Sequence, residues 1–308
     1  MAKSVRETIK EITRKHLTEK DGLCFGQCLT AVGWVGGTLP ELYEEDGMVE
    51  VTTADVANGG FVVGAGLQGK RPIYVVRYQG FQWYNAAMIV NYASKSKEIW
   101  DIPCPILIRS IAMEGGMGPV AGSSHHSLYQ RMPGTRIIAP MTPREYEFAY
   151  EMFTDHDDVY HISEHRRSYD NTENLPDIYE DEPDVVLMPI GITRFDAIEA
   201  RKILKEKYNR SVSICNMLWI KPWSWNKSMW KVELNKSKHG GLVLDDDYEQ
   251  GVASYFAKQM MLERNFSQKK VHTLGLDHRT AGFHPDVDNL PPSPEKIVEK
   301  VLEICYNH

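Results

Sequence analysis

Short apolar runs alternate with amphipathic stretches along the first half of the chain. Residues 5–19 place Ile9, Ile12 and Leu17 on one face, a spacing that predicts a surface helix. Apolar runs bounded by glycine or proline predict strands near residues 23–32, 70–78, 103–111, 135–140 and 158–165. Helices are expected between them, at about 85–96 and at 142–155. Strands that alternate with helices indicate an α/β fold with a mostly parallel sheet.

The second half repeats the alternation on a smaller scale, after a polar, acidic and proline-punctuated segment. Apolar runs at 184–191, 211–218, 240–247 and 270–276 alternate with helical patterns at 197–208, 253–265 and after Pro294. We therefore predict two domains with a linker between them, since 308 residues are about twice the length of a typical domain. The predicted ranges are 1–175, 176–183 for the linker, and 184–308.

The overall composition argues against several classes of protein. The formal net charge is −7 with both signs interspersed, which argues against a nucleic-acid binder. The chain has no apolar run of the roughly 18 residues that a membrane span needs, and its charged N-terminal segment lacks a signal peptide's apolar stretch. A cytoplasmic protein without membrane contact is expected. Five cysteines indicate no disulfide framework, and Cys24 and Cys28 are predicted to be buried structural thiols.

Two groups of side chains near predicted strand ends could carry chemistry. Asp55 precedes a glycine-rich helix, where a carboxylate either caps the helix or anchors a ligand. An aromatic cluster follows the strand at 70–78, and its rings either stack on a flat heterocycle or pack between strand and helix. Its members are Tyr78, Phe81, Trp83 and Tyr84. Both alternatives stay open for each group, although ligands of open parallel sheets bind at this edge.

A glycine-rich loop ending in two histidines is the third candidate. Its glycines allow the backbone to approach a ligand closely, and they are Gly115, Gly116, Gly118 and Gly122. His125 and His126 follow beside serines, and imidazole suits proton transfer because it titrates near neutrality. No partner stands at the spacing of a zinc site, so no metal ligand is predicted in this chain. A Ser-His nucleophile pair is conceivable, but the chain has no G-x-S-x-G elbow.

These motifs together resemble the beta subunit of the thiamine-diphosphate-dependent dehydrogenase component of 2-oxo acid dehydrogenase complexes. The most telling stretch is TTADVANGGFVVGAGLQGKRPIYVVRYQGFQWYNAAMIVNYASK, and HHS followed by PGTRIIAPMTP matches the next section. GLVLDDD and LPPSPEKIV are similar to the family's C-terminal domain. The C-terminal half of transketolase is a more distant likeness. The resemblance implies a pyrimidine-binding domain followed by a transketolase C-terminal-type domain.

The resemblance also implies roles for single residues. Asp55 stands where the family has a glutamate that bonds a ring nitrogen of the cofactor's aminopyrimidine. Phe81 matches the aromatic that stacks on that ring, with Tyr78 beside it. His126 matches the active-site histidine, with His125 next to it, and Gln27 stands at a further acidic position. Asp55 is therefore one methylene shorter than its counterpart and Gln27 cannot ionise, which leaves substrate and efficiency open.

An absent motif predicts a partner. Thiamine enzymes hold the diphosphate through a divalent metal bound by Gly-Asp-Gly, and this chain has no such sequence. The resemblance thus implies an alpha-type subunit that supplies most of the Mg²⁺ and diphosphate contacts, in an alpha2beta2 heterotetramer, with a lipoyl-domain acyltransferase as a further candidate partner. The expected reaction is decarboxylation of a 2-oxo acid with acyl or aldehyde transfer. A split transketolase subunit and a non-catalytic scaffold subunit are the alternatives.

Overall fold

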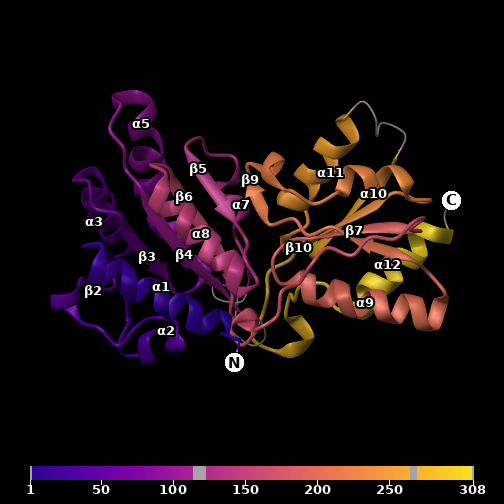
Figure 1. Cartoon of the computed structure of the whole chain (residues 1–308), viewed down its shortest axis with the longest axis horizontal. Coiled ribbons are helices and arrows are strands. Elements are labelled where there is room, and N and C mark those ends of the chain that lie inside the picture. Colours follow the sequence, from indigo (N-terminus) through magenta and orange to yellow (C-terminus); the bar gives the residue numbers. More distant parts are fainter. Residues whose placement is uncertain (1, 114–122, 264–268, 307–308) are drawn as a thin grey trace. The chain divides into compact units, whose positions relative to one another are not determined.

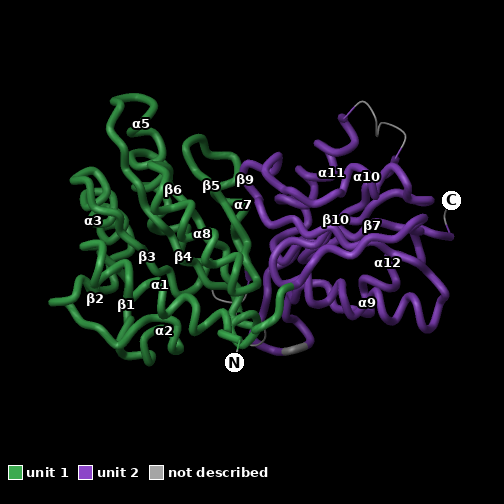
Figure 2. The backbone as a smooth tube through the Cα atoms, in the orientation of Figure 1, with its two compact units in different colours: residues 1–113, 124–174 green, residues 114–123, 175–308 purple. Residues whose placement is uncertain are grey.

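The computed structural model describes residues 2–113, 123–263 and 269–306. The chain divides into two compact units, one of residues 1–113 with 124–174 and the other of residues 114–123 with 175–308, coloured separately in Figure 2. In the part of the chain so described, no helix is both long and apolar enough to cross a membrane.

The first unit is built on a parallel sheet. Its strands are β1 (Leu23–Gln27), β2 (Met48–Val51), β3 (Pro72–Val76), β4 (Ile106–Ala112), β5 (Thr135–Ile138) and β6 (Val159–His165). They lie in the order β2-β1-β3-β4-β6-β5, and each neighbouring pair is parallel (Figure 1). The carboxyl ends of these strands therefore share one edge of the sheet, where ligands of open parallel sheets bind.

Helical segments connect these strands. They are α1 (Val5–Glu19), α2 (Gly33–Gly37), η1 (Glu44–Asp46), α3 (Asp55–Leu67), η2 (Gln79–Phe81), α4 (Gln82–Met88), η3 (Ile89–Ala93), α5 (Ser94–Trp100), α7 (Ser127–Gln130), α8 (Pro143–Asp155) and η4 (Arg166–Ser168). The helices predicted at 5–19 and 142–155 are confirmed, each with a reciprocal capping box at its start. The helix predicted at 85–96 is too short, because helical structure runs from Gln82 to Trp100 through the π-helical segment η3.

The short element α2 is a left-handed turn. Residues 33–37 all have positive φ, including the non-glycine residues Trp34 and Val35 at 49° and 52°. Each such L-residue costs roughly 1–2 kcal/mol, so surrounding contacts have to hold the turn in place. Two arginines do so: Arg6 donates a hydrogen bond to the carbonyl of Gly36, and Arg109 donates one of 3.1 Å to the hydroxyl of Thr38. This turn follows β1 at the carboxyl edge of the sheet.

The second unit has a smaller parallel sheet in the order β11-β10-β7-β8. The strands of this sheet are β7 (Val185–Pro189), β8 (Val212–Ile214), β10 (Gly241–Tyr248) and β11 (Val271–Leu276), and the unit also contains the short strand β9 (Trp219–Lys221), which lies outside this sheet. Its helical segments are α9 (Thr193–Tyr208), η5 (Trp223–Trp225), α10 (Trp230–Lys236), α11 (Val252–Leu262), η7 (Pro285–Val287) and α12 (Pro294–Tyr306). Helices α9 and α12 cover one face of the sheet and α10 and α11 the other (Figure 1). Both units thus have the predicted α/β class with parallel sheets.

Candidate functional site

A cavity of about 250 Å³ opens at the carboxyl edge of the first sheet. Its lining residues are Gln27, Cys28, Asp55, Tyr74, Val75, Val76, Arg77, Tyr78, Phe81 and Asn85. Four of the six predicted site residues are thus brought together, although they come from β1, α3 and the segment after β3. The reason is topological: β1 and β3 are parallel neighbours, so the residues that follow their ends converge.

Asp55 is held in this cavity by a side chain and not by its own helix. The residue before it, Ala54, is the N-cap of α3, and no side chain caps that helix end. Instead, the Gln27 amide nitrogen donates a hydrogen bond of 3.0 Å to one carboxylate oxygen, Oδ1. The other oxygen, Oδ2, has no hydrogen-bond partner among residues 2–113, 123–263 and 269–306. The helix-cap alternative is therefore wrong, and one carboxylate oxygen is available to a ligand.

Aromatic rings form one wall of the cavity. The rings of Tyr78 and Phe81 meet edge to face, with centroids 5.6 Å apart, and both side chains are only half-buried. The Arg77 guanidinium lies over the Tyr78 ring at 5.0 Å and donates a 3.0 Å hydrogen bond to its hydroxyl. Trp83 and Tyr84, the other members of the predicted cluster, are more than half exposed and do not line the cavity.

Tyr74 and Asn85 add polar groups that the sequence reading missed. The Asn85 amide donates a 3.2 Å hydrogen bond to the Tyr74 hydroxyl. Burial, reinforced by the negative charge of Asp55, raises the pKa of Tyr74, so the phenol keeps its proton. That hydroxyl can donate a hydrogen bond into the cavity beside the Asp55 acceptor. The strand pattern hid Tyr74, because an aromatic residue in a fully buried strand usually belongs to the core.

The two histidines are connected to this region, but neither lines the cavity. His126 is fully buried, and its Nδ1 lies 3.0 Å from the hydroxyl of Ser163 on β6. The backbone nitrogen of His125 donates a 2.6 Å hydrogen bond to the side-chain oxygen of Gln79, two residues before Phe81. The structure therefore ties the histidine pair to the turn that carries the aromatic wall. The preceding glycines, at 115, 116, 118 and 122, lie outside the described residues.

The two cysteines near the site differ. Cys24 is buried within β1, and burial raises the pKa of its thiol to about 12. Cys28 is exposed and lines the cavity, so the prediction of a buried thiol is wrong at this position. Its φ of +52° marks a turn directly after β1, where the strand's burial no longer applies.

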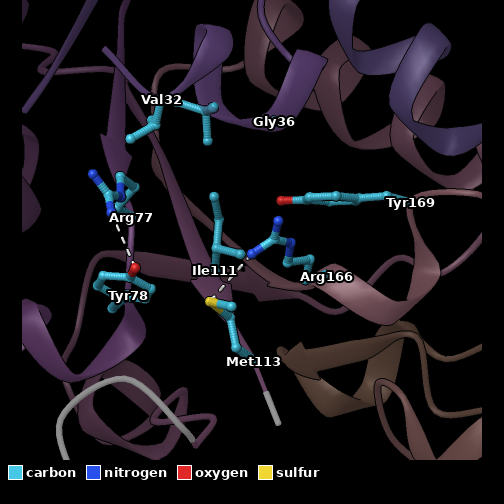
Figure 3. A pocket seen from close by; sticks show the side chains of 9 residues that line it. Val32, Gly36, Arg77, Tyr78, Ile111, Met113, Arg166 and Tyr169 are labelled. Atoms are coloured by element: carbon cyan, nitrogen blue, oxygen red, sulfur yellow. Dashed lines mark hydrogen bonds between the residues drawn. The ribbon is translucent and has the colours of Figure 1, made fainter. Parts of the chain in front are cut away.

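A second cavity of about 230 Å³ shares Arg77 and Tyr78 with the first. Its lining residues are Val32, Val35, Gly36, Arg77, Tyr78, Ile111, Met113, Arg166 and Tyr169. Figure 3 shows Arg77 and Arg166 entering it from different walls, with Ile111 between them. Neither guanidinium forms an ion pair within the described part of the chain; Arg166 only approaches the Met113 sulfur at 3.9 Å. Two uncompensated cations with apolar walls suit an anionic ligand.

The comparisons with known proteins agree with this architecture. The sequence matches the family described as "Transketolase, pyrimidine binding domain" over residues 6–172, more than half of the chain. The chain belongs to this family. The match spans the sheet and both cavities of the first unit.

Curated relatives are beta subunits. The 2-oxoisovalerate dehydrogenase subunit beta of Bacillus subtilis (strain 168) is 28% identical over 172 residues, about half of each chain (51% of both). The pyruvate dehydrogenase E1 component subunit beta of Chaetosphaeridium globosum is 23% identical over 305 residues, 89% of this chain and 90% of that one. The chain is thus a beta-subunit-like member of the pyrimidine-binding family, as the sequence motifs predicted.

Solved structures confirm the fold. The inactive beta4 tetramer of a split-gene transketolase matches with a TM-score of 0.72 at 13% identity, over 99% of both chains. A transketolase variant from Pichia stipitis matches with a TM-score of 0.72 at 13% identity, over 99% of this chain and 46% of that one. The transketolase-type architecture predicted for both domains is therefore confirmed.

Proposed function

We propose that this chain is the beta-type subunit of a heteromeric thiamine-diphosphate enzyme and that the cavity around Asp55 receives the cofactor's aminopyrimidine ring. The observation that carries the proposal is the Asp55 carboxylate, fixed through one oxygen by Gln27 with the other oxygen available beside the Phe81 ring. Thiamine diphosphate supplies a carbanion centre on which 2-oxo acid or ketose chemistry proceeds.

The cavity fits part of the cofactor and not all of it. Sites for whole ligands of drug size occupy roughly 300–1,000 Å³, and this cavity has about 250 Å³. An acceptor, a phenol donor and an aromatic edge, from Asp55, Tyr74 and Phe81, match a flat heterocycle with an amino group and ring nitrogens. The lining has no second carboxylate for a metal ion, so Mg²⁺ and the diphosphate would be held mainly by the partner subunit.

Exposed apolar side chains support such a partner. Helices α3 to α5 expose large apolar residues, namely Val56, Phe61, Leu67, Trp83, Tyr84, Tyr92, Ile99 and Trp100. Helix α3 packs against α4 and η3, and large exposed apolar patches mark protein interfaces. An alpha-type subunit, in an alpha2beta2 heterotetramer, is the occupant we propose, with residues 1–175 as the pyrimidine-binding domain, 176–183 as the linker and 184–308 as the C-terminal domain. A cytoplasmic location and a lipoyl-domain acyltransferase partner complete the proposal.

Each site residue then has a role. Asp55 accepts a hydrogen bond from the ring nitrogen, Gln27 holds Asp55, and Phe81 with Tyr78 stacks on the ring. His126 handles a proton of the reacting substrate, with His125 beside it. The favoured reaction is decarboxylation of a 2-oxo acid followed by acyl or aldehyde transfer, as the names of the curated relatives suggest.

The arginine cavity favours a second candidate, ketol transfer between sugar phosphates. A phosphosugar enzyme needs a basic pocket, and Arg77 with Arg166 forms one next to the proposed ring site. Replacing the exposed Arg166 by Gln should raise the KM of an anionic donor by about 10–150-fold, since hydrogen bonds to charged groups contribute roughly 1.5–3 kcal/mol. A loss confined to phosphosugar donors would favour the split transketolase, and a loss with 2-oxo acids would favour the dehydrogenase subunit.

Calorimetry with and without the partner tests the proposal itself. The chain alone should bind thiamine diphosphate with Mg²⁺ poorly, and the complex with a Gly-Asp-Gly-bearing subunit should bind it well. Micromolar, Mg²⁺-dependent binding by the isolated chain would contradict a site divided between subunits. A complex that assembles but binds no cofactor would favour the scaffold alternative.

A further inference from the structure

A chain of hydrogen bonds inside the first unit ends on His126. Gln79, fully buried on η2, donates from its amide nitrogen to the Ser163 hydroxyl at 2.8 Å. The Ser163 oxygen in turn lies 3.0 Å from Nδ1 of His126. The three residues come from η2, β6 and the segment before α7, so tertiary structure alone brings them together.

The orientation of the Gln79 amide is fixed by its neighbours. Its oxygen faces the His125 backbone nitrogen, a group that can only donate, at 2.6 Å. Its nitrogen faces the Ser163 hydroxyl and the backbone carbonyls of Ser110 and Glu164 at 3.3 and 3.4 Å. A flipped amide would place donor against donor and acceptor against acceptor. The amide nitrogen therefore donates to Ser163, because an amide NH₂ group has no acceptor capacity.

The direction of the next bond follows. The Ser163 oxygen already accepts from Gln79, and a hydroxyl has a single hydrogen to donate. Among the described residues, Nδ1 of His126 is the acceptor available to that hydrogen. If Nδ1 carried a proton instead, the hydroxyl hydrogen of a buried serine would lose its partner, which is unfavourable.

We infer that Gln79 and Ser163 are positioning residues that hold His126 as the neutral tautomer with its proton on Nε2, so that His126 acts as a hydrogen-bond donor. The role in the reaction rests on the proposed function, whereas the tautomer itself follows from the contacts. A histidine so fixed carries a donor hydrogen at Nε2 and does not start as a base at that nitrogen.

The neighbouring strand offers a matched control. Ser110 on β4 lies 2.5 Å from Nε2 of His161, so it contacts a different buried histidine through the same chemical group. Removing the Ser110 hydroxyl should leave the tautomer of His126 unchanged, whereas removing the Ser163 hydroxyl should change it.

Nitrogen NMR of histidine-labelled full-length chain tests the inference, alone and assembled with the partner subunit. Wild type and Ser163→Thr, which keeps the hydroxyl, should show an unprotonated Nδ1 and a protonated Nε2 at His126, in at least about tenfold excess. Ser163→Ala and Gln79→Leu should each give a mixture of tautomers, and Ser110→Ala should match wild type. If Ser163→Ala fails to fold, Gln79→Leu tests the same chain of hydrogen bonds.

Two results would overturn the inference: a protonated Nδ1 in the wild type, or an unchanged tautomer in the variants without the hydroxyl or the amide. Turnover of the assembled enzyme separates this from the proposed function. Ser163→Ala should lower kcat and change KM much less, and Ser163→Thr should keep kcat close to the wild-type value. A fixed tautomer together with full turnover of His126→Ala would retain the positioning and refute the catalytic role.

Discussion

Replacing Asp55 by Asn is the sharpest test of the ring site, because it keeps the size of the side chain and removes its charge. The Gln27 amide can still donate to the remaining carbonyl oxygen, as it does to Oδ1 at 3.0 Å. The group that faces the cavity then becomes an amide NH₂, which donates where the ring nitrogen needs an acceptor. A hydrogen bond to a charged group contributes about 1.5–3 kcal/mol, so the cofactor Kd should rise by about 10–150-fold.

The assay combines calorimetry of the assembled enzyme with the exchange rate of the cofactor's thiazolium proton. In the variant the Kd should rise and the exchange rate should fall. Folding should survive, since Asp55 is half-buried and an acidic residue in the first helical turn contributes only about 0.3–1 kcal/mol. Asp21→Asn is the control, because Asp21 is an exposed carboxylate paired with Lys70 away from the cavity. An unchanged Kd and exchange rate in Asp55→Asn would refute the anchoring role.

The remaining predictions concern the interior of the first unit. His126→Ala should lower turnover of the assembled enzyme by about 10²–10⁴-fold and His125→Ala by much less; equal mild losses would contradict the assignment. Glu164→Gln should destabilise the fold by about 3–5 kcal/mol in denaturant unfolding, because it leaves Arg109, paired with it at 2.6 Å and fully buried, without its counter-charge; a loss below about 1 kcal/mol would refute this. Burial lowers the pKa of His161 from its usual 6.5 to about 3, so the unfolded chain binds a proton there that the folded chain does not. The free energy of unfolding should therefore stay constant above that usual pKa and decrease at lower pH by up to about 1.4 kcal/mol per pH unit. In His161→Gln this decrease should be smaller, which a comparison of unfolding midpoints near pH 7 and pH 5 measures.

Local pattern was sufficient for the elements but not for their irregularities. The capped helix at Thr142 and the strands of the first sheet follow from capping residues and apolar runs that act over a few positions. The left-handed turn at 33–37 depends on Arg6 and Arg109, which reach it from other elements. Sequence neighbours carry no trace of such contacts, so neither that turn nor the π-helical segment η3 could be predicted.

The candidate site could likewise be predicted only in part. Gln27, Asp55 and Phe81 could be expected together because residues that follow parallel strands meet at one edge. Arg166 could not, since it follows β6 and enters a cavity with Arg77 only through the folded sheet. The hydrogen bonds from Gln79 through Ser163 to His126 could not be predicted for a related reason: each residue alone resembles an ordinary polar residue of a buried strand or turn.

This chain differs from the family at Asp55 and at Gln27, and the contact between these two residues changes how the differences should be interpreted. Taken separately, a shortened carboxylate and a residue that cannot ionise each suggest a subunit that has lost catalysis. In the structure they lie 3.0 Å apart, donor to acceptor. Two carboxylates at that distance would repel each other, and one would be driven to hold a proton. An amide at position 27 instead donates to Asp55 and fixes it, so the second departure compensates the first. Since an uncharged partner keeps the carboxylate of Asp55 available as an acceptor, the pair supports a working cofactor site more than a scaffold, and the Asp55→Asn experiment decides between the two.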